Sequence, residues 1–237
     1  MRVFISLTGY SPVKRMTHWA VNQLLSCPSP EFAESALKPI AGPDVARSLA
    51  ASLFLQDETF DAILFIDDDI VFDPKDAVKL AKHIEEGRHV VGGCYVTKTA
   101  HPQPTTSFFD GQSVKFHAEA GPVKVRRLAG GFFMASKKVF LALAAKLPKC
   151  NSKENMSFYP FFMPYVLTSG IWSKEFEYVT EDYAFMDRAR DKGFDIWLDP
   201  SIRLIHTGEK NFSLEDIFQN GHAPMPEVTL TKDAKRI

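Results

Sequence analysis

Three adjacent carboxylates, Asp67 to Asp69, directly follow the apolar run Ile63–Ile66, and apolar residues resume after them. An apolar run of this length bounded by polar residues is typical of a buried strand. Because ionised carboxylates repel one another and are costly to desolvate, such a cluster usually holds a cation. Mg²⁺ and Mn²⁺ take oxygen ligands and often join carboxylates to phosphate oxygens. The pattern predicts a metal and phosphate site at the end of a central strand; a solvated acidic loop is the alternative.

A further group of polar residues stands where the surrounding elements could bring it to these acids. The strand predicted at Val3–Leu7 is broken at Thr8, Gly9 and Tyr10, and Asp73 with Pro74 is the start expected of a helix. Strands that alternate with amphipathic helices indicate a largely parallel sheet covered by helices. In such sheets ligands lie beyond the carboxyl ends of the strands, so the residues after the first strand and the acid cluster could share one ligand.

The predicted elements divide the chain into a regular first half and a less regular second half. In the first half we expect strands over 3–7, 62–66 and 89–92, and helices over 16–25, from Asp44 as N-cap to 55, and from Asp73 to Gly87. In the second half we expect short strands around 105–109, 114–116, 123–128, 195–198 and 203–206; helices over 137–147, from Thr180 to Gly193 and from Ser213 to Asn220; and a long aromatic-rich loop over 151–173.

Composition bounds the class of protein. A chain of 237 residues can form one large domain with a substantial core. A formal net charge of −1 gives no electrostatic reason for nucleic-acid binding. Cys27, Cys94 and Cys150 form no C-x-x-C pair, which argues against structural zinc and indicates reduced thiols. No run approaches the ~20 apolar residues of a membrane span. We therefore expect a soluble, cytoplasmic protein without a transmembrane segment.

In their order along the chain, these motifs resemble the GT-A-type glycosyltransferases, which move a sugar from a nucleotide-sugar onto an acceptor. The compact form is similar to sugar transferases of bacteria and large DNA viruses. One departure is Arg47-Ser48, where relatives often have Arg-Asn. The resemblance runs from about Val3 to Gly208 and rests on the first strand with its Thr/Tyr turn, Ala46-Arg47-Ser48, the Asp-x-Asp of the acid cluster, Gly130-Gly131-Phe132, Thr180-Glu181-Asp182, and His206 followed by Thr207-Gly208.

The resemblance implies an α/β fold of GT-A (Rossmann-like) type. Its central sheet is mixed and mostly parallel, with helices on its flanks and antiparallel additions in the second half. A single catalytic domain would span residues 1–208, with a nucleotide-sugar-binding half at 1–100 and an acceptor-binding half at 101–208. Residues 209–237 would form a C-terminal helix and tail.

The resemblance also implies a divalent cation, Mn²⁺ or Mg²⁺, between the acid cluster and the diphosphate of a UDP- or GDP-linked sugar. Asp69 would bind the metal directly, Asp67 would hold the ribose or a metal-bound water, and Asp68 would support them. His206 would be a further ligand, since neutral imidazole binds Mn²⁺ alongside carboxylates. A structural role is the alternative for His206, because it is commoner for a lone histidine.

Other residues would contact the nucleotide-sugar. Glycines let the backbone approach a donor sugar closely, although a turn before the next helix also explains a Gly-Gly pair. An arginine on the helix would reach phosphates or base, although a solvent-facing arginine paired with an acid is as ordinary. The residues implied in donor binding are Thr8, Gly9, Tyr10, Arg47, Asp67, Asp68, Gly130 and Gly131.

Asp182 is the candidate general base, with Glu181 as its alternative. An inverting transfer needs a carboxylate to take the proton of the acceptor hydroxyl, here a hydroxyl of a glycan or glycoprotein. Both acids also have a structural explanation, because a helix that begins after Thr180 favours negative charge in its first turn.

Three other classes of protein are alternatives to this interpretation. A phosphatase of the haloacid-dehalogenase type uses an apolar strand followed by Asp-x-Asp, with Asp67 as nucleophile, but that motif normally follows the first strand. A nucleotidyltransferase would need a Gly-rich basic loop that the opening lacks. A non-catalytic carbohydrate-binding module would explain the aromatic residues and leave the acid cluster without a purpose.

Overall fold

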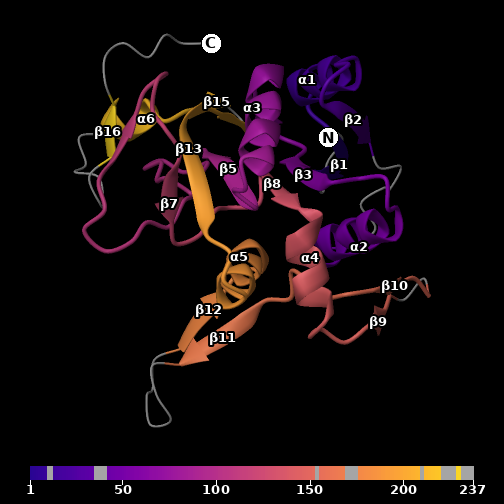
Figure 1. Cartoon of the computed structure of the whole chain (residues 1–237). Helices are drawn as coiled ribbons and strands as arrows, with labels where there is room; N and C mark the ends of the chain where they lie inside the picture. The colour runs from indigo at the N-terminus through magenta and orange to yellow at the C-terminus, as the bar shows by residue number, and fades with distance from the viewer. Residues whose placement is uncertain are drawn as a thin grey trace.

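A mixed seven-stranded sheet with helices on both faces forms the centre of the molecule (Figure 1). The computed structural model describes residues 1–9, 13–34, 42–152, 155–168, 176–208, 211–219 and 228–230. In spatial order the strands are β2 (Glu31–Glu34), β1 (Arg2–Thr8), β3 (Ala62–Asp67), β8 (Phe132–Ser136), β5 (Val90–Cys94), β13 (Ile196–Arg203) and β7 (Val123–Val125).

Five of these strands point the same way, and β8 and β7 run against them. Both opposing strands come from the second half of the chain. The predicted α/β class, with a mostly parallel sheet and antiparallel additions in the second half, is therefore confirmed.

Helices cover the sheet in two layers because β3 is apolar on both of its faces. Ile63 and Phe65 pack into one buried cluster, and Leu64 and Ile66 pack into another. A strand buried on both sides reads as a continuous apolar run rather than an alternation. The first cluster includes residues of α2 (Pro43–Gln56), α4 (Lys137–Ala144) and α5 (Glu181–Asp191); the second includes residues of α1 (Arg15–Leu25) and α3 (Pro74–Glu85).

A small second sheet begins directly after the acid cluster. β4 (Ile70–Val71) follows the acids directly and pairs with β14 (Ile205–Thr207), which also pairs with β15 (Asn211–Phe212). In this register His206 lies opposite Ile70. A strand from the end of the chain is thereby brought against the turn that carries Asp69.

Several boundaries differ from those expected. Residues 105–109 form no strand; the segment makes one isolated bridge, between Ser107 and Arg127. The strand predicted at 195–198 continues to Arg203 as β13, with a register shift between Leu198 and Arg203, and the strand predicted at 203–206 falls on the end of β13 and on β14. The 151–173 segment is not wholly loop, because its described part enters two local hairpins: β9 (Cys150–Asn151) with β10 (Ser157–Phe158), and β11 (Tyr165–Thr168) with β12 (Phe176–Val179).

The capping predictions had mixed outcomes. Asp73 caps α3 by accepting a hydrogen bond of 2.9 Å from the backbone N–H of Lys75. Asp44 does not cap α2, because Pro43 already begins that helix and Gly42 takes the N-cap position. The remaining short elements are β6 (Val114–Phe116), which pairs with β16 (Val228–Leu230), and α6 (Asp216–Gln219).

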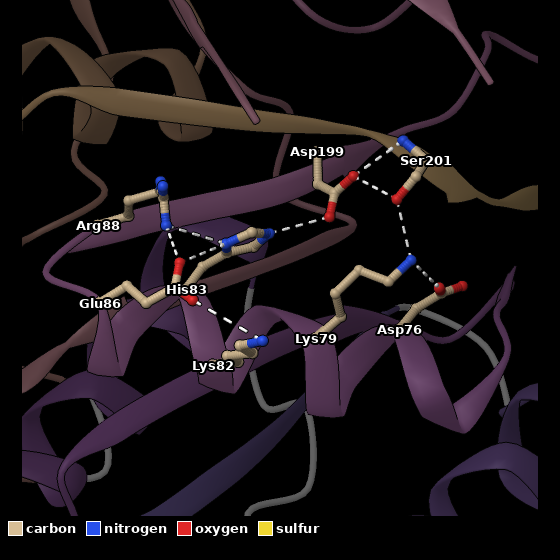
Figure 2. A network of polar contacts seen from close by, with 8 residues as sticks. All are labelled: Asp76, Lys79, Lys82, His83, Glu86, Arg88, Asp199 and Ser201. Carbon is tan, nitrogen blue, oxygen red and sulfur yellow. Dashed lines mark hydrogen bonds and ion pairs between the residues drawn. The ribbon is translucent and has the colours of Figure 1, made fainter. Parts of the chain in front are cut away.

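A buried polar network fastens α3 to the irregular part of β13 (Figure 2). Asp199, which is 2% exposed, contacts Nε2 of His83 at 2.9 Å and accepts hydrogen bonds from Ser201. Lys79 lies between Ser201 and Asp76, at 2.9 and 3.5 Å. The network positions β13 immediately before the segment that carries His206.

Candidate active site

The carboxyl ends of β1 and β3 lie side by side, as the sequence predicts. Thr8 pairs with Asp67 in the parallel register, and the N–H of Asp68 donates to the carbonyl of Thr8 at 2.8 Å. Gly9 is needed here, since a β-carbon on it would lie 2.0 Å from Cγ of Asp68. Tyr10, the last residue expected in this group, lies outside the described residues.

Arg47 of α2 joins the end of β3 to the start of α5. Its Nη2 donates to Asp67 at 2.6 Å and its Nη1 donates to Glu181 at 2.7 Å, while its own side chain is only 4% exposed. Burial opposes the charge of Arg47, but the surrounding acids hold its pKa above the ordinary value. The arginine is therefore a buried cation shared by two carboxylates and is not solvent-facing. Its neighbour Ser48 points into the core, where it accepts the N–H of Phe162.

The Gly130-Gly131 segment lies between Arg47 and the other residues of the site. The N–H of Gly130 donates to Oδ2 of Asp182 at 3.0 Å, and a β-carbon on Gly130 would lie 2.6 Å from Cζ of Arg47. Gly131 donates to the hydroxyl of Tyr95 and accepts from the N–H of Asp67, at 3.0 and 2.9 Å. Both glycines are thus required by close approach, and neither has a positive φ.

Glu181 and Asp182 occupy the first turn of α5 and are held differently. Oδ1 of Asp182 accepts from the hydroxyl of Thr180 and the N–H of Tyr183, at 2.7 and 2.8 Å. Burial, helped by the charge of Asp182, raises the pKa of Glu181, and Arg47 opposes this rise. Burial likewise raises the pKa of Asp67 against the effect of Arg47. Asp67, Glu181 and Asp182 therefore form one partly buried cluster around the Arg47 guanidinium, and Asp69 joins it on the side of Asp67.

Asp69 faces His206 and Lys98. His206 donates through Nδ1 to the carbonyl of Val96 at 2.8 Å, and its other ring nitrogen, Nε2, faces Oδ1 of Asp69 at 3.4 Å. Lys98 donates to the other oxygen, Oδ2. Burial opposes ionisation of Asp69, but hydrogen bonds from His206 and Lys98 lower its pKa below the usual range.

The donor atoms at Asp69 fit a divalent cation in kind, although they do not form a complete ligand set. A carboxylate beside a neutral imidazole is a donor pair that suits Mn²⁺, and a carbonyl on the second ring nitrogen is the partner that metal-binding histidines usually have. Among the described residues, no group of three or more His, Cys, Asp or Glu side chains is arranged to hold a metal. Asp67, the third ligand expected, is turned to Arg47. A cation here would complete its coordination with phosphate oxygens or water.

Two residues of the site were missed by the sequence reading. Tyr95 is 6% exposed, contacts Gly131 through its hydroxyl, and packs edge-on against the ring of His206 at 5.0 Å. Lys98 reaches Asp69. Both follow the carboxyl end of β5, so the strand-end rule that pointed to Thr8 and Asp67 would have found them had it been applied there as well.

Comparison with known proteins supports the fold and adds no sequence family. No family model and no curated protein matches the chain. The crystal structure of A197 from STIV is similar over 87% of this chain and 85% of that one, with a TM-score of 0.54 and 19% sequence identity. This similarity is to the fold alone. GalNAc-T7, crystallised with UDP, GalNAc and Mn²⁺, matches 86% of this chain and 43% of its own, with 11% identity and a TM-score of 0.47, too low to support an argument.

In the part of the chain that the structure describes, no helix has the length and apolarity to cross a bilayer.

Proposed function

We propose that this chain is a metal-dependent glycosyltransferase. It would transfer a sugar from a UDP- or GDP-sugar to a hydroxyl of a glycan or glycoprotein, with inversion and with Asp182 as general base. The observation that carries the proposal is the double hydrogen bond of Arg47, which couples Asp67 at the end of β3 to Glu181 at the start of α5. Acids on the side of the donor and acids on the side of the acceptor would thereby belong to one partly buried cluster around Arg47.

The residues at the ends of β1 and β3 would have different roles in binding the donor and the cation. Thr8 and Gly9 lie at the end of β1, where Thr8 pairs with Asp67. The Thr8 hydroxyl and the Gly9 backbone would therefore be near a nucleotide held at Asp67. The hydroxyl of Thr8 is buried and has no hydrogen-bond partner among the described residues, which supports a role in ligand binding. Asp69 and His206 would hold the cation, which would supply charge neutralisation to the departing diphosphate. Asp68 packs against Gly9 and supports this turn.

Asp182 is positioned to accept a proton because its carboxylate is oriented before an acceptor arrives. Three hydrogen bonds, from Thr180, Tyr183 and Gly130, fix its plane. A base held in this way loses little entropy when the acceptor hydroxyl reaches it. Glu181 remains the alternative, since burial raises its pKa and so favours proton uptake by its carboxylate.

The phosphatase alternative gains no support from this geometry. Its nucleophile would be Asp67, whose Oδ1 accepts a hydrogen bond from Arg47 at 2.6 Å. A carboxylate engaged by a buried guanidinium is a poorer nucleophile, because its negative charge is already stabilised. The strand that ends at Asp67 is also not the first strand of the sheet.

Calorimetric titration with UDP and GDP, with and without Mn²⁺, tests the proposal. The wild-type protein should bind one of the two nucleotides and bind it at least tenfold more tightly with Mn²⁺. Asp69→Ala should lose that Mn²⁺-dependent gain, while Asp67→Asn should weaken binding less. Asp191→Asn, at the exposed end of α5, is the matched control and should behave as wild type. Equal nucleotide binding by Asp69→Ala and wild type in Mn²⁺ would refute the metal assignment.

A further inference from the structure

Lys98 occupies the place of a cation at Asp69. Its ammonium donates to Oδ2 of Asp69 and lies 3.4 Å from the carbonyl oxygen of Thr207, while His206 contacts Oδ1. Both carboxylate oxygens are therefore engaged, one by an imidazole and one by a positive charge. A divalent cation bound to Asp69 would meet this ammonium at close range.

The segment around Lys98 is held independently of Asp69. Thr97 exchanges hydrogen bonds with Gln103, its N–H donating to the Gln103 carbonyl at 2.9 Å and its hydroxyl accepting from the Gln103 N–H at 3.0 Å. The hydroxyl of Thr99 donates to the carbonyl of His101 at 2.8 Å. The loop therefore keeps its base in position when the lysine side chain leaves Asp69. Because that side chain is one-third exposed and flexible, its ammonium can turn to another anion nearby.

We propose that Lys98 competes with the divalent cation for Asp69 and, once displaced, binds the diphosphate of the nucleotide-sugar. The inference rests on the function proposed above and adds a second phosphate-binding cation to it. Like charges at close range repel, so lysine and metal cannot both stay on Asp69 without a large cost. Phosphate oxygens are the natural next partner, since lysine binds them as a point charge.

The Lys98→Gln variant separates the two roles by their opposite signs. Removing the competitor should tighten the binding of Mn²⁺ alone about two- to fivefold, as expected for a partly exposed ion pair. Removing the phosphate partner should weaken UDP or GDP binding in EDTA about tenfold, as expected for a hydrogen bond to a charged group. Free Mn²⁺ is read by electron paramagnetic resonance and nucleotide by calorimetry. A lysine with a purely structural role would weaken both or change neither.

Two control variants complete the test. Lys98→Arg keeps the charge and should bind both ligands within about twofold of wild type. Lys124→Gln makes the same charge change at a surface ion pair with Asp195, 2.7 Å long, and should alter neither affinity. If wild type binds Mn²⁺ and nucleotide but Lys98→Gln shows no tighter Mn²⁺ binding, the Lys98 proposal alone is wrong. If wild type binds neither Mn²⁺ nor nucleotide, the proposed function fails with it.

Discussion

Arg47 and Gly130 are in such close contact that the glycine has no room for a side chain. A β-carbon at position 130 would lie 2.6 Å from Cζ of Arg47 and 2.8 and 2.9 Å from its two terminal nitrogens. The guanidinium is 4% exposed and is hydrogen-bonded on its far side to Asp67 and Glu181. The guanidinium therefore lies between the backbone of Gly130 and the two carboxylates, and Gly130 holds the arginine against these acids.

Gly130→Ala should therefore displace Arg47 and disturb both ion pairs. We expect the free energy of unfolding to fall by about 1–3 kcal/mol, as overpacking of a tight interior does, and nucleotide affinity to fall at least tenfold. Urea denaturation and calorimetry measure the two effects. Gly121→Ala is the control, since a β-carbon there meets nothing within 4 Å. An alanine tolerated equally at both positions would contradict the contact.

Replacing Arg47 itself should cost more stability than replacing an exposed arginine. Arg47→Met keeps the bulk but leaves Asp67 and Glu181 without their cation, so we expect a loss of about 2–3 kcal/mol. Arg2→Met breaks an exposed pair with Glu31 and should cost less than about 1 kcal/mol. Urea denaturation of the two variants at neutral pH gives the comparison, and similar losses would mean that the Arg47 pairs add no net stability.

The two acids of α5 can be told apart by rate. Asp182→Asn should lower kcat for Mn²⁺-dependent donor hydrolysis at least a hundredfold with little change in KM, because a general base contributes to the reaction step. Glu181→Gln should lower kcat less than tenfold. The reverse order would assign the base to Glu181, and full activity in both variants would remove general-base catalysis from this helix.

Asp76 should make stability fall as pH rises. Burial, helped by Asp73 against the effect of Lys79, raises its pKa from 3.8 to about 6. An acid whose pKa is raised on folding keeps its proton in the folded state while the unfolded state releases it, so stability is lost between pH 3.8 and pH 6. The shift corresponds to at most about 3 kcal/mol.

The test compares wild type with Asp76→Asn across that pH window. The wild-type protein should lose stability relative to Asp76→Asn as pH increases from 4 to 7, measured by urea denaturation. Asp44→Asn changes an acid in the first turn of another helix and serves as control. A constant difference between wild type and Asp76→Asn would show that burial does not raise this pKa.

The sequence predicted an element correctly where that element depends mainly on residues adjacent in the chain. The apolar run before Asp67 predicted β3, because a strand covered on both faces needs apolar residues at every position. Asp73 with Pro74 predicted the start of α3, because capping involves neighbouring residues only. The rule that parallel strands end at one edge placed Thr8 beside Asp67 before any contact was known.

Strand β8 shows where local pattern fails. The strands predicted from the sequence do not include residues 130–136, yet Phe132–Ser136 forms the strand between β3 and β5. Its position depends on antiparallel pairing with two strands that precede it in the chain by tens of residues. Nothing within seven residues specifies such partners, because strand order is decided by how whole elements cover one another's apolar faces.

The sequence by itself determined the α/β class, the acid cluster and the helix that begins with Glu181 and Asp182. Only the tertiary structure decided that Arg47 bonds to Glu181, 134 residues away, and that Lys98 reaches Asp69. The physical reason is that hydrogen bonding and ion pairing act over a few ångströms. A chain brings such residues within that distance only after the sheet has fixed which strand ends are neighbours.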